Sequence, residues 1–492
     1  MESGKIHSLK YISLCIKGER MNNKERDEKF LKSWLKKKIS ITTSTVVGFL
    51  ITGAVGGGAA YGAGNRAGTG GNNNSVAWGQ GSSVDNDSVA VGANARAVSA
   101  SAGIPAVTSK GVAIGNNAKA EGSISIGELS SSNHFGVAIG YNAGAQNTTT
   151  GSSFANVTIG ANTRVGVQGG TQAAQGIAIG SGIQAHEGAW AKGDQSIAIG
   201  ANTESTGDSS IAIGGDDLKS VSNKTSSYSD ARFDKNGNKI GGNSNNTASV
   251  NNIFSRLTGR GAILNGGIGT DGTNYSQWRN TQSGQGGVAL GVKSISGDIA
   301  LAIGTFSEAT GTNSVAIGTG AQTPQSGAVA IGGGSTTNGL QGRQITDADI
   351  TLTDGTTMAL TNFAGASGVL EGSMVSFGKA GNERQLKHIA PGEVTATSTD
   401  GINGSQLFAV AKKLGDDISK FKYVSIKSND AGNKLNDGAT ANNAIAIGPN
   451  ASTKVESGVS LGDGANVLPG PTKDKAGTLL QTVISSGSGV AI

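Results

Sequence analysis

A five-residue pattern of small, β-branched and glycine residues recurs along this chain from Ser75 to Gly462. Its commonest form is Ser-Val-Ala-Ile-Gly, and successive copies stand 13 or 14 residues apart, as from Gly127 to Gly140 and from Gly304 to Gly318. A fixed short period predicts a solenoid, in which each unit buries its apolar face by stacking on its neighbours. The closing glycines are Gly79, Gly92, Gly115, Gly127, Gly140, Gly160, Gly180, Gly200, Gly214, Gly291, Gly304, Gly318, Gly332, Gly448 and Gly462.

The phrase is typical of a short β-strand that ends in a tight turn. In residues 314–318, Val315 and Ile317 alternate with Ala316, so the two β-branched side chains share one face of a strand. The glycine and the Asn that often follows it tolerate positive φ. A second, smaller phrase such as Ser307–Gly311 comes next. We therefore predict coils of two strands and two turns, with Val and Ile facing inward.

Such coils are thin, and this argues for self-association. The chain has 81 glycines in 492 residues and only 4% aromatic residues. Burying one Val and one Ile contributes about 4 kcal/mol per coil, whereas ordering a coil of 14 residues costs several times more. The Ala face adds stability only where another surface covers it. The sequence thus predicts an all-β parallel solenoid that packs against copies of itself.

Composition and charge narrow the class of protein. Residues 1–60 hold 11 Lys and Arg against 5 Asp and Glu, whereas the remainder holds 28 against 29, so the body has no basic surface for nucleic acid. The single cysteine, Cys15, lies in this leader. The four histidines are scattered without acidic or Cys partners. We expect no nucleic-acid partner, no catalytic residue, no cofactor and no metal.

Residues 1–60 resemble a leader with a secretory signal. A basic stretch, Lys32–Lys38, precedes a weakly apolar stretch, Ile39–Val55, and small residues follow to Ala60. Met21 is an alternative start. A transmembrane anchor is the competing interpretation, weakened by the Ser, Thr and Gly residues in the apolar stretch. We expect cleavage near Ala60 and an exported protein.

The chain changes character after the last regular coil. Residues 340–378 lose the period and predict an irregular β segment. A segment with Arg384-Gln385-Leu386 and then Asp400-x-x-Asn403-Gly-Ser-Gln406-Leu407 follows. Apolar residues then continue at spacings of 4, 3, 4 and 3, which is the a/d pattern of a coiled coil. Its predicted core is Leu407, Ala411, Leu414, Ile418 and Phe421.

This combination of a Ser-Val-Ala-Ile-Gly roll, an Arg-Gln-Leu segment and an Asp-x-x-Asn-Gly-Ser-Gln-Leu motif resembles trimeric autotransporter adhesins of the Yersinia-adhesin-A-like branch. The resemblance implies a homotrimer of left-handed parallel β-rolls, a neck, and a short trimeric coiled coil. It also implies a location on the bacterial cell surface or outer membrane. Carried over to this chain, the residues that hold the trimer at the neck are Arg384, Gln385, Leu386, Asp400, Asn403, Gln406 and Leu407.

The motifs divide the chain as follows: leader 1–60, β-roll head 61–339 with an insertion at 215–286, irregular β segment 340–378, neck 379–406, coiled coil 407–421, and a second head-like segment 422–492 that looks incomplete. Relatives end in a membrane anchor of four long strands with alternating apolar residues. Those strands are missing up to Ile492. We therefore expect the anchor on a missing extension or on another polypeptide.

The insertion concentrates the aromatic and Arg residues that dominate protein interfaces. They form either a small core of their own or a receptor contact, and the candidate receptor-binding residues are Tyr228, Phe233, Arg256, Arg260, Tyr275, Trp278 and Arg279. Residues 232–240 predict a hairpin with an Asn-Gly turn. Asp234-x-Asn236-x-Asn238 is similar to a calcium loop, but its glycine comes too early for one.

Three functions follow from these features. An adhesin would present a protein-binding head, and the resemblance implies matrix proteins such as collagen or fibronectin, or carcinoembryonic-antigen-related adhesion molecules, as ligands. An enzyme on a left-handed β-helix would need a six-residue period and a His base, and this chain has neither. A structural spacer or coat fibre without a specific ligand is the alternative. The insertion favours the adhesin.

Overall fold

The computed structural model describes residues 75–85, 87–98, 110–145, 155–166, 173–184, 186–353, 355–419, 432–433, 437–468, 483–485 and 490–491. The predicted leader lies outside these residues. The chain divides into two compact units, one ending at Gln385 and one beginning at Leu386. Among the described residues, no helix combines the length and the apolar character needed to span a bilayer.

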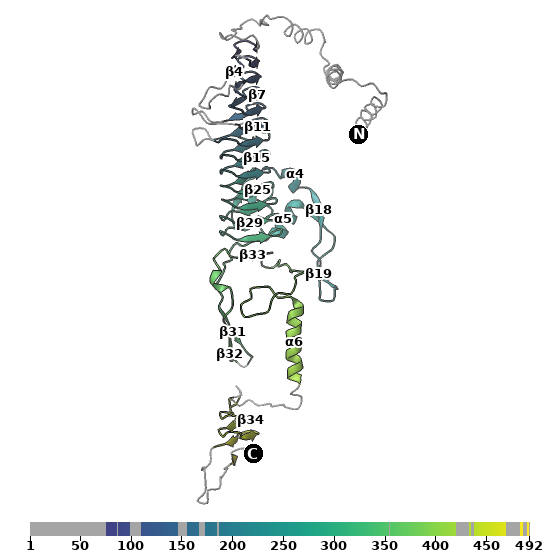
Figure 1. Cartoon of the computed structure of the whole chain (residues 1–492). Helices are drawn as coiled ribbons and strands as arrows, with labels where there is room; N and C mark the ends of the chain where they lie inside the picture. Colours follow the sequence, from purple (N-terminus) through teal and green to yellow (C-terminus); the bar gives the residue numbers. More distant parts are fainter. Residues whose placement is uncertain are drawn as a thin grey trace, which may run out of the picture. The chain divides into compact units, whose positions relative to one another are not determined.

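The first unit contains a β-roll built from two parallel sheets (Figure 1). The larger sheet has 14 strands: β1 (Val76–Trp78), β3 (Val89–Val91), β5 (Val112–Ile114), β7 (Ile124–Ile126), β9 (Val137–Ile139), β11 (Val157–Ile159), β13 (Ile177–Ile179), β15 (Ile197–Ile199), β17 (Ile211–Ile213), β25 (Val288–Leu290), β27 (Leu301–Ile303), β29 (Val315–Ile317), β30 (Val329–Ile331) and β33 (Val375–Ser376). Each strand except β33 is one of the copies of the repeated phrase named above, so the predicted all-β roll is confirmed, and β33 adds a rung from the segment predicted to be irregular.

The second sheet is formed by the smaller phrase of each coil. Its 11 strands are β2 (Ser83–Val84), β4 (Arg96–Val98), β6 (Lys119–Glu121), β8 (Ser131–Asn133), β10 (Gly144–Ala145), β12 (Arg164–Val165), β14 (Trp190–Ala191), β16 (Thr203–Ser205), β24 (Thr281–Ser283), β26 (Ile295–Ser296) and β28 (Glu308–Ala309). Phrases stack in register, as in Val315 opposite Leu301 on one side and Val329 on the other.

The repeated glycine is required by the stacking of turns. Gly318 has φ of 130°, and a Cβ on it would lie 2.5 Å from the carbonyl carbon of Gly332 in the next coil. Carbon atoms that are not bonded to each other do not approach this closely in proteins. Each closing glycine therefore permits the next coil to approach, and this fixes the pattern that defines the sequence.

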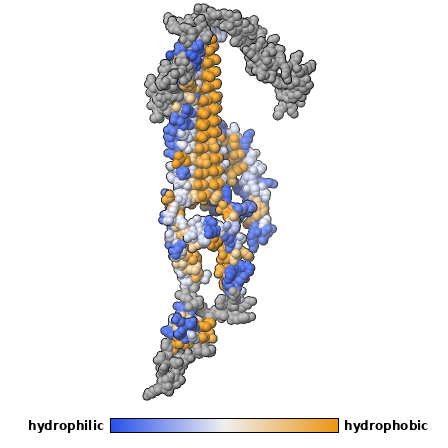
Figure 2. Space-filling model, viewed as in Figure 1, coloured by the Kyte–Doolittle hydropathy of each residue, from blue (hydrophilic) through white to orange (hydrophobic). Residues whose placement is uncertain are grey.

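The sequence predicts that the Val and Ile side chains of the larger sheet point inward, but the structure shows that they point outward. Ala316 is fully buried, as are Ala302 and Ala330 beside it, whereas Val and Ile on either side lie partly in solvent. A coil of 13 or 14 residues is narrow, and the inward positions of the larger sheet hold Ala, Ser or Thr, so the β-branched side chains of that sheet point outward. They form a continuous apolar stripe along the roll (Figure 2). We call the outward Val, Ile and Leu side chains of the larger sheet the apolar stripe.

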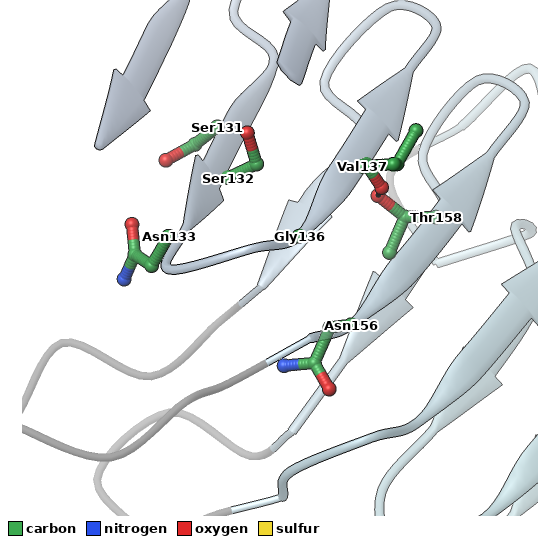
Figure 3. Close-up of a pocket in the computed structure, with 7 residues that line it drawn as sticks. All are labelled: Ser131, Ser132, Asn133, Gly136, Val137, Asn156 and Thr158. Atoms are coloured by element: carbon green, nitrogen blue, oxygen red, sulfur yellow. Dashed lines mark hydrogen bonds between the residues drawn. The ribbon is translucent and has the colours of Figure 1, made fainter. Parts of the chain in front are cut away.

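Ser and Thr side chains in the interior of the roll hydrogen-bond to one another or to backbone carbonyls. Ser123 Oγ lies 2.8 Å from Ser132 Oγ, and Ser125 Oγ lies 2.7 Å from Ser130 Oγ. Thr158 replaces the central Ala of its strand, and its hydroxyl donates to the carbonyl of Val137 at 3.3 Å (Figure 3). At these positions hydroxyls therefore substitute for Ala with a hydrogen-bond partner, whereas the buried Oγ of Ser296 in the second sheet has none.

Residues between β17 and β24 leave the roll and fold beside it (Figure 1). They contain α4 (Lys219–Ser222), the antiparallel pair β18 (Thr225–Tyr228) and β21 (Asn246–Ser249), the pair β19 (Arg232–Phe233) and β20 (Lys239–Gly241), helix α5 (Val250–Thr258), and the pair β22 (Gly267–Ile268) and β23 (Asn274–Tyr275). The return to the roll comes at Thr281, inside the predicted 215–286 interval, because Thr281 pairs with Thr203 as a regular rung.

Between β30 and β33 the chain makes a second excursion. It contains the antiparallel ribbon β31 (Asp347–Thr351) and β32 (Thr357–Thr361) and a short 3-10 turn, η1 (Ala366–Gly368). Within the described residues, β31 and β32 pair as strands only with each other. The excursion ends where β33 adds to β30 in parallel.

The second unit contains helix α6 (Gly404–Ile418) and a short roll. That roll repeats the phrase in β34 (Ile445–Ile447) and β36 (Val459–Leu461), with β35 (Ser452–Thr453) and β37 (Ala465–Val467) as its second sheet. Strands β38 (Val483–Ser485) and β39 (Val490–Ala491) pair with it in antiparallel fashion. Ala465 is again fully buried, while Ile445 is 47% exposed.

Candidate functional site

The insertion between β17 and β24 docks on a single column of turns in the roll. This column holds the second residue after each closing glycine. In five coils without the insertion it is Asn, with left-handed φ at Asn94, Asn117, Asn142, Asn162 and Asn202. In three others it is Gly81, Leu129 and Gly182. Under the insertion it is Lys293, Phe306, Gly320 and Gly334, so Asn is absent where the insertion covers the column.

Phe306 is the centre of the contact. It is fully buried, with Phe254 of α5 at 5.5 Å and Tyr275 of β23 at 5.5 Å between ring centroids. Leu218, Ile263 and Leu264 complete the cluster. The insertion therefore has an apolar core that includes one residue of the roll itself.

Helix α5 lies close to the turns of two further coils. Ser249 caps its first turn by accepting from the Asn252 amide at 3.2 Å, and Gly259 ends it with φ of 68°. A Cβ at Gly320 would lie 2.4 Å from the Thr258 side chain, and one at Gly334 would lie 2.2 Å from the carbonyl oxygen of Leu257. Glycine at these two turns is what allows the helix to pack.

A buried charge cluster joins the insertion to the second sheet. Glu308 in β28 accepts from Arg260 Nη2 at 3.0 Å and pairs with Arg279, and Gln322 Nε2 donates to it at 2.7 Å. The two guanidinium groups also lie over the Phe306 ring, each at 4.8 Å from its centroid. Burial raises the pKa of Glu308, but Arg260 and Arg279 outweigh it and hold the pKa below its ordinary value.

Lys293 is a second buried cation at this contact. Its side chain is fully buried, and its ammonium donates to the carbonyl of Leu264 at 2.6 Å. Burial lowers the pKa of Lys293 to about 8, although Asp216 and Asp217 oppose the change. Sequence analysis missed Lys293, Phe306 and Glu308, because each was assigned to a regular coil.

The structure separates the candidate receptor-binding residues into two groups. Arg260 and Arg279 are buried, and Tyr275 accepts from Arg260 Nη2 at 2.9 Å and donates to Asp271 at 2.8 Å. These three residues belong to the insertion's own core. Phe233 and Trp278 are 58% and 54% exposed. Tyr228 and Arg256 stack at the surface at 5.4 Å, and Arg256 also pairs with Asp230.

Residues 232–240 form the hairpin that the sequence predicts. The Asp234 carboxylate accepts from the amides of Asn236 and Asn238, each at 2.8 Å, and from the Asn238 side chain at 3.1 Å. These bonds make the carboxylate part of the turn. Among the described residues, no group of three or more His, Cys, Asp or Glu side chains has the geometry to hold a metal ion.

The predicted neck residues fall in two networks, one in each unit. Arg384 returns to the last coils of the roll, donating to Ser335 Oγ at 2.8 Å, to the Gly333 carbonyl at 2.6 Å and to the Phe377 carbonyl. In the second unit, Asn403 caps α6 by accepting from the Ser405 and Gln406 amides. Gln406 Nε2 donates to the Gly392 carbonyl at 2.6 Å, and Asp400 accepts from the Glu393 amide at 3.0 Å.

The predicted coiled-coil residues lie on α6 with their apolar side chains in solvent. Leu407, Leu414 and Ile418 are 61%, 58% and 69% exposed, and Ala411 is exposed between them. Phe421 lies outside the described residues. Neck residues Gln385 and Leu386 are also exposed. Lys412 and Lys413 pair with Asp416 and Asp417 one turn further on.

A small hollow between strand β8 of the second sheet and strands β9 and β11 of the larger sheet is lined by Ser131, Ser132, Asn133, Gly136, Val137, Asn156 and Thr158 (Figure 3). Its lining contains no carboxylate, lysine or histidine. The hollow has no room for a water-sized molecule. We assign it no chemistry.

Comparison with known proteins identifies the roll. A family model described as the YadA head domain repeat (2 copies) matches residues 110–129, 191–216, 296–321 and 439–465. The first three segments are coils of the large roll, and the fourth is the short roll of the second unit. In these segments the chain is similar to the YadA head domain repeat, and we call the roll a YadA-type head.

One solved structure that matches part of the chain is the C-terminal YadA-like domain of BPSL2063 from Burkholderia pseudomallei. It is 30% identical to this chain, and the match covers 25% of this chain and 47% of that chain, with a TM-score of 0.18. The match thus spans about half the length of that relative. No curated protein matches the sequence. The YadA-type head described above carries its insertion between two matched segments, 191–216 and 296–321.

Proposed function

We propose that this protein is a bacterial surface adhesin whose YadA-type heads assemble as a parallel homotrimer and present the insertion to host proteins. The observation that carries the proposal is the pairing of two surfaces. The apolar stripe runs the length of the roll, and the insertion is fixed to another side of the same coils. One surface suits self-association, and the other stays free for a ligand.

The apolar stripe supports the trimer. Outward side chains such as Ile139, Ile159 and Ile331 are each exposed by 38–39% in the single chain. A continuous apolar surface of this length is unusual on a monomeric protein and marks an interaction site. The exposed Leu407, Leu414 and Ile418 on α6 suit the same assembly, because a helix with an a/d seam buries it against copies of itself.

The exposed aromatic residues of the insertion support ligand binding. Phe233 and Trp278 lie on a domain whose core is locked to the roll, so little order has to be gained when a partner binds. Three copies per trimer would add avidity to a weak single contact. The partner class is a host cell-surface protein, such as a carcinoembryonic-antigen-related adhesion molecule, or a matrix protein such as collagen or fibronectin.

The test replaces residues 216–280 by a short Gly-Ser linker and adds Lys293→Asn and Phe306→Asn. The two substitutions restore the turn residue found in uncovered coils, so the roll keeps a compatible surface after the insertion is gone. We expect a folded trimer that no longer binds host cells or a panel of matrix proteins. A surface control, Ile183→Ala, should bind as the wild type does, because that side chain is 97% exposed on a turn of the roll.

Two results would change this assignment. If the deleted trimer adheres with undiminished affinity, the ligand surface lies on the roll and the insertion has another purpose. If neither the wild type nor the variant binds any host or matrix protein, the chain is a structural spacer. Phe233→Ala with Trp278→Ala provides a milder version of the test, because both side chains are exposed and their loss leaves the core intact.

A further inference from the structure

The ribbon β31–β32 has one apolar face and one polar face. Cross-strand pairing places Ile350 opposite Met358 and Ala348 opposite Leu360. Residues two apart along a strand share a face, so these four side chains form a single apolar surface. The pairs Asp347–Thr361 and Thr351–Thr357 lie on the opposite face. The alternation is that of a sheet with one buried side, although this ribbon stands alone.

Nothing in the described part of the chain covers the apolar face. Ile350, Met358 and Leu360 are 40%, 45% and 38% exposed. A two-stranded ribbon is at best marginally stable in water and needs a third layer or strand. The excursion also exposes further large apolar side chains: Leu340, Ile345, Leu352, Phe363 and Leu370. So many apolar groups in about 30 residues indicate a covered surface.

The position of the ribbon indicates what covers it. It leaves the roll after β30 and returns at β33, and these two strands are neighbouring rungs of the sheet that bears the apolar stripe. Val375 in β33 continues that stripe and is 54% exposed. Thr336 still pairs with Gln322 of the preceding coil, so the ribbon leaves the roll at the turn before β33, at the edge of the surface proposed to join copies of the chain. In a parallel assembly every copy presents its ribbon at the same level.

We propose that the apolar face of β31–β32 packs against a second copy of this chain, so that each protomer clasps its neighbour at the end of the head. The inference rests on the proposed homotrimer but does not follow from it, because the stripe could assemble while the ribbons stay free. The polar face, with Asp347 and Asp349, then lies toward solvent. The ribbon acts as an interlock between protomers at the last coil.

The chain offers a clean chemical test, because Cys15 is its only cysteine. In the full chain with Cys15→Ser, Met358→Cys on the apolar face is compared with Thr357→Cys on the polar face. Both positions are exposed in the single chain. In the native assembly we expect maleimide to label the Met358→Cys thiol at least about tenfold more slowly, since labelling then waits for the interface to open.

A photo-crosslinking amino acid at position 358 identifies the molecule that packs against the apolar face of β31–β32. We expect crosslinked species of two or three chain masses, and none from the same probe at position 357. Equal labelling of the two cysteines, or crosslinks only within one chain, would overturn the proposal. Light scattering on the same samples separates this result from failure of the trimer, since a trimer with freely labelled Met358→Cys rejects the clasp alone. A crosslink to another protein would equally reject a second copy as the occupant.

Discussion

Phe306 and Asn202 occupy the same turn position in two coils of the roll, and both have left-handed backbone, with φ of 61° and 50°. Asn tolerates this conformation, whereas a bulky aromatic residue adopts it rarely. Phe306 is fully buried under the insertion, but the Asn202 side chain bonds to Asp216 in the next turn at 2.7 Å. The strain at Phe306 is thus offset by the apolar core that it enters.

Replacing Phe306 by Ala should detach the insertion. Loss of a buried Phe costs about 3–5 kcal/mol, and here the two neighbouring rings and two arginines lose their common contact. Hydrogen exchange should show loss of protection in 250–280 while the roll strands stay protected. Phe135→Ala is the matched control, because Phe135 also has φ of 61° but is 47% exposed. Equal effects of both substitutions would contradict the role given to Phe306.

Glu308→Gln should weaken the same contact by a different route. Removing one partner of a buried pair leaves the opposite charges uncompensated and costs about 3 kcal/mol or more. Because the folded pKa of Glu308 is depressed, its stabilisation is present above the ordinary Glu pKa and is lost as the pH falls through the folded value. Denaturation profiles from pH 7 to pH 3 should therefore converge for wild type and variant. Asp416→Asn, in an exposed pair, should change stability by less than about 1 kcal/mol.

Lys293 should give a pH dependence of the same sign in an alkaline window. Its folded pKa of about 8 lies below the ordinary Lys value of 10.5, so between these values the unfolded chain binds more protons than the folded one. Stability of the insertion should then rise with pH across this window. The comparison is the stability of wild type and Lys293→Met at pH 7.5 and pH 10. A rise of the same size in the variant would exclude Lys293 as its source.

The period of the phrase, the two strands per coil and the Gly and Asn turns could all be predicted from the sequence. The side of the strand that faces inward could not. Alternation shows that Val315 and Ile317 share a face, and hydrophobicity alone assigns that face to the interior. The roll instead has room only for Ala316. The outward apolar face is explained by packing between copies of the chain, and the sequence of a single repeat does not show that packing.

The contact between the roll and the insertion could not be predicted from the sequence either. Arg260 and Glu308 lie 48 positions apart, and the smaller phrase that contains Glu308 gives no indication of a charged partner. One signal was present: the Asn of the turn column is replaced by Lys293 and Phe306 in two successive coils. A bulky residue where glycine or Asn is needed for left-handed backbone indicates a compensating contact. The receptor-binding role of Phe233 and Trp278 stays a prediction.

The neck network gives a separate prediction about the second unit. Asn403 accepts from two amides at the start of α6, so Asn403→Ala should destabilise the helix by about 1–2 kcal/mol. Adding Leu407→Asp places a charge on the exposed apolar seam. The double variant should melt at a lower temperature or dissociate. An unchanged melting point and unchanged mass would contradict the neck assignment of Asp400–Leu407.

The central claim is that the apolar stripe joins three copies of the chain. The most direct measurement is the mass of residues 61–421 in solution by light scattering, with circular dichroism to show that the β-roll is folded. The account predicts a mass of three chains for the wild type. Ile159→Asp with Ile317→Asp, which places charges on the stripe and leaves the buried Ala column intact, should lower that mass. A folded wild type with the mass of a single chain would contradict the account.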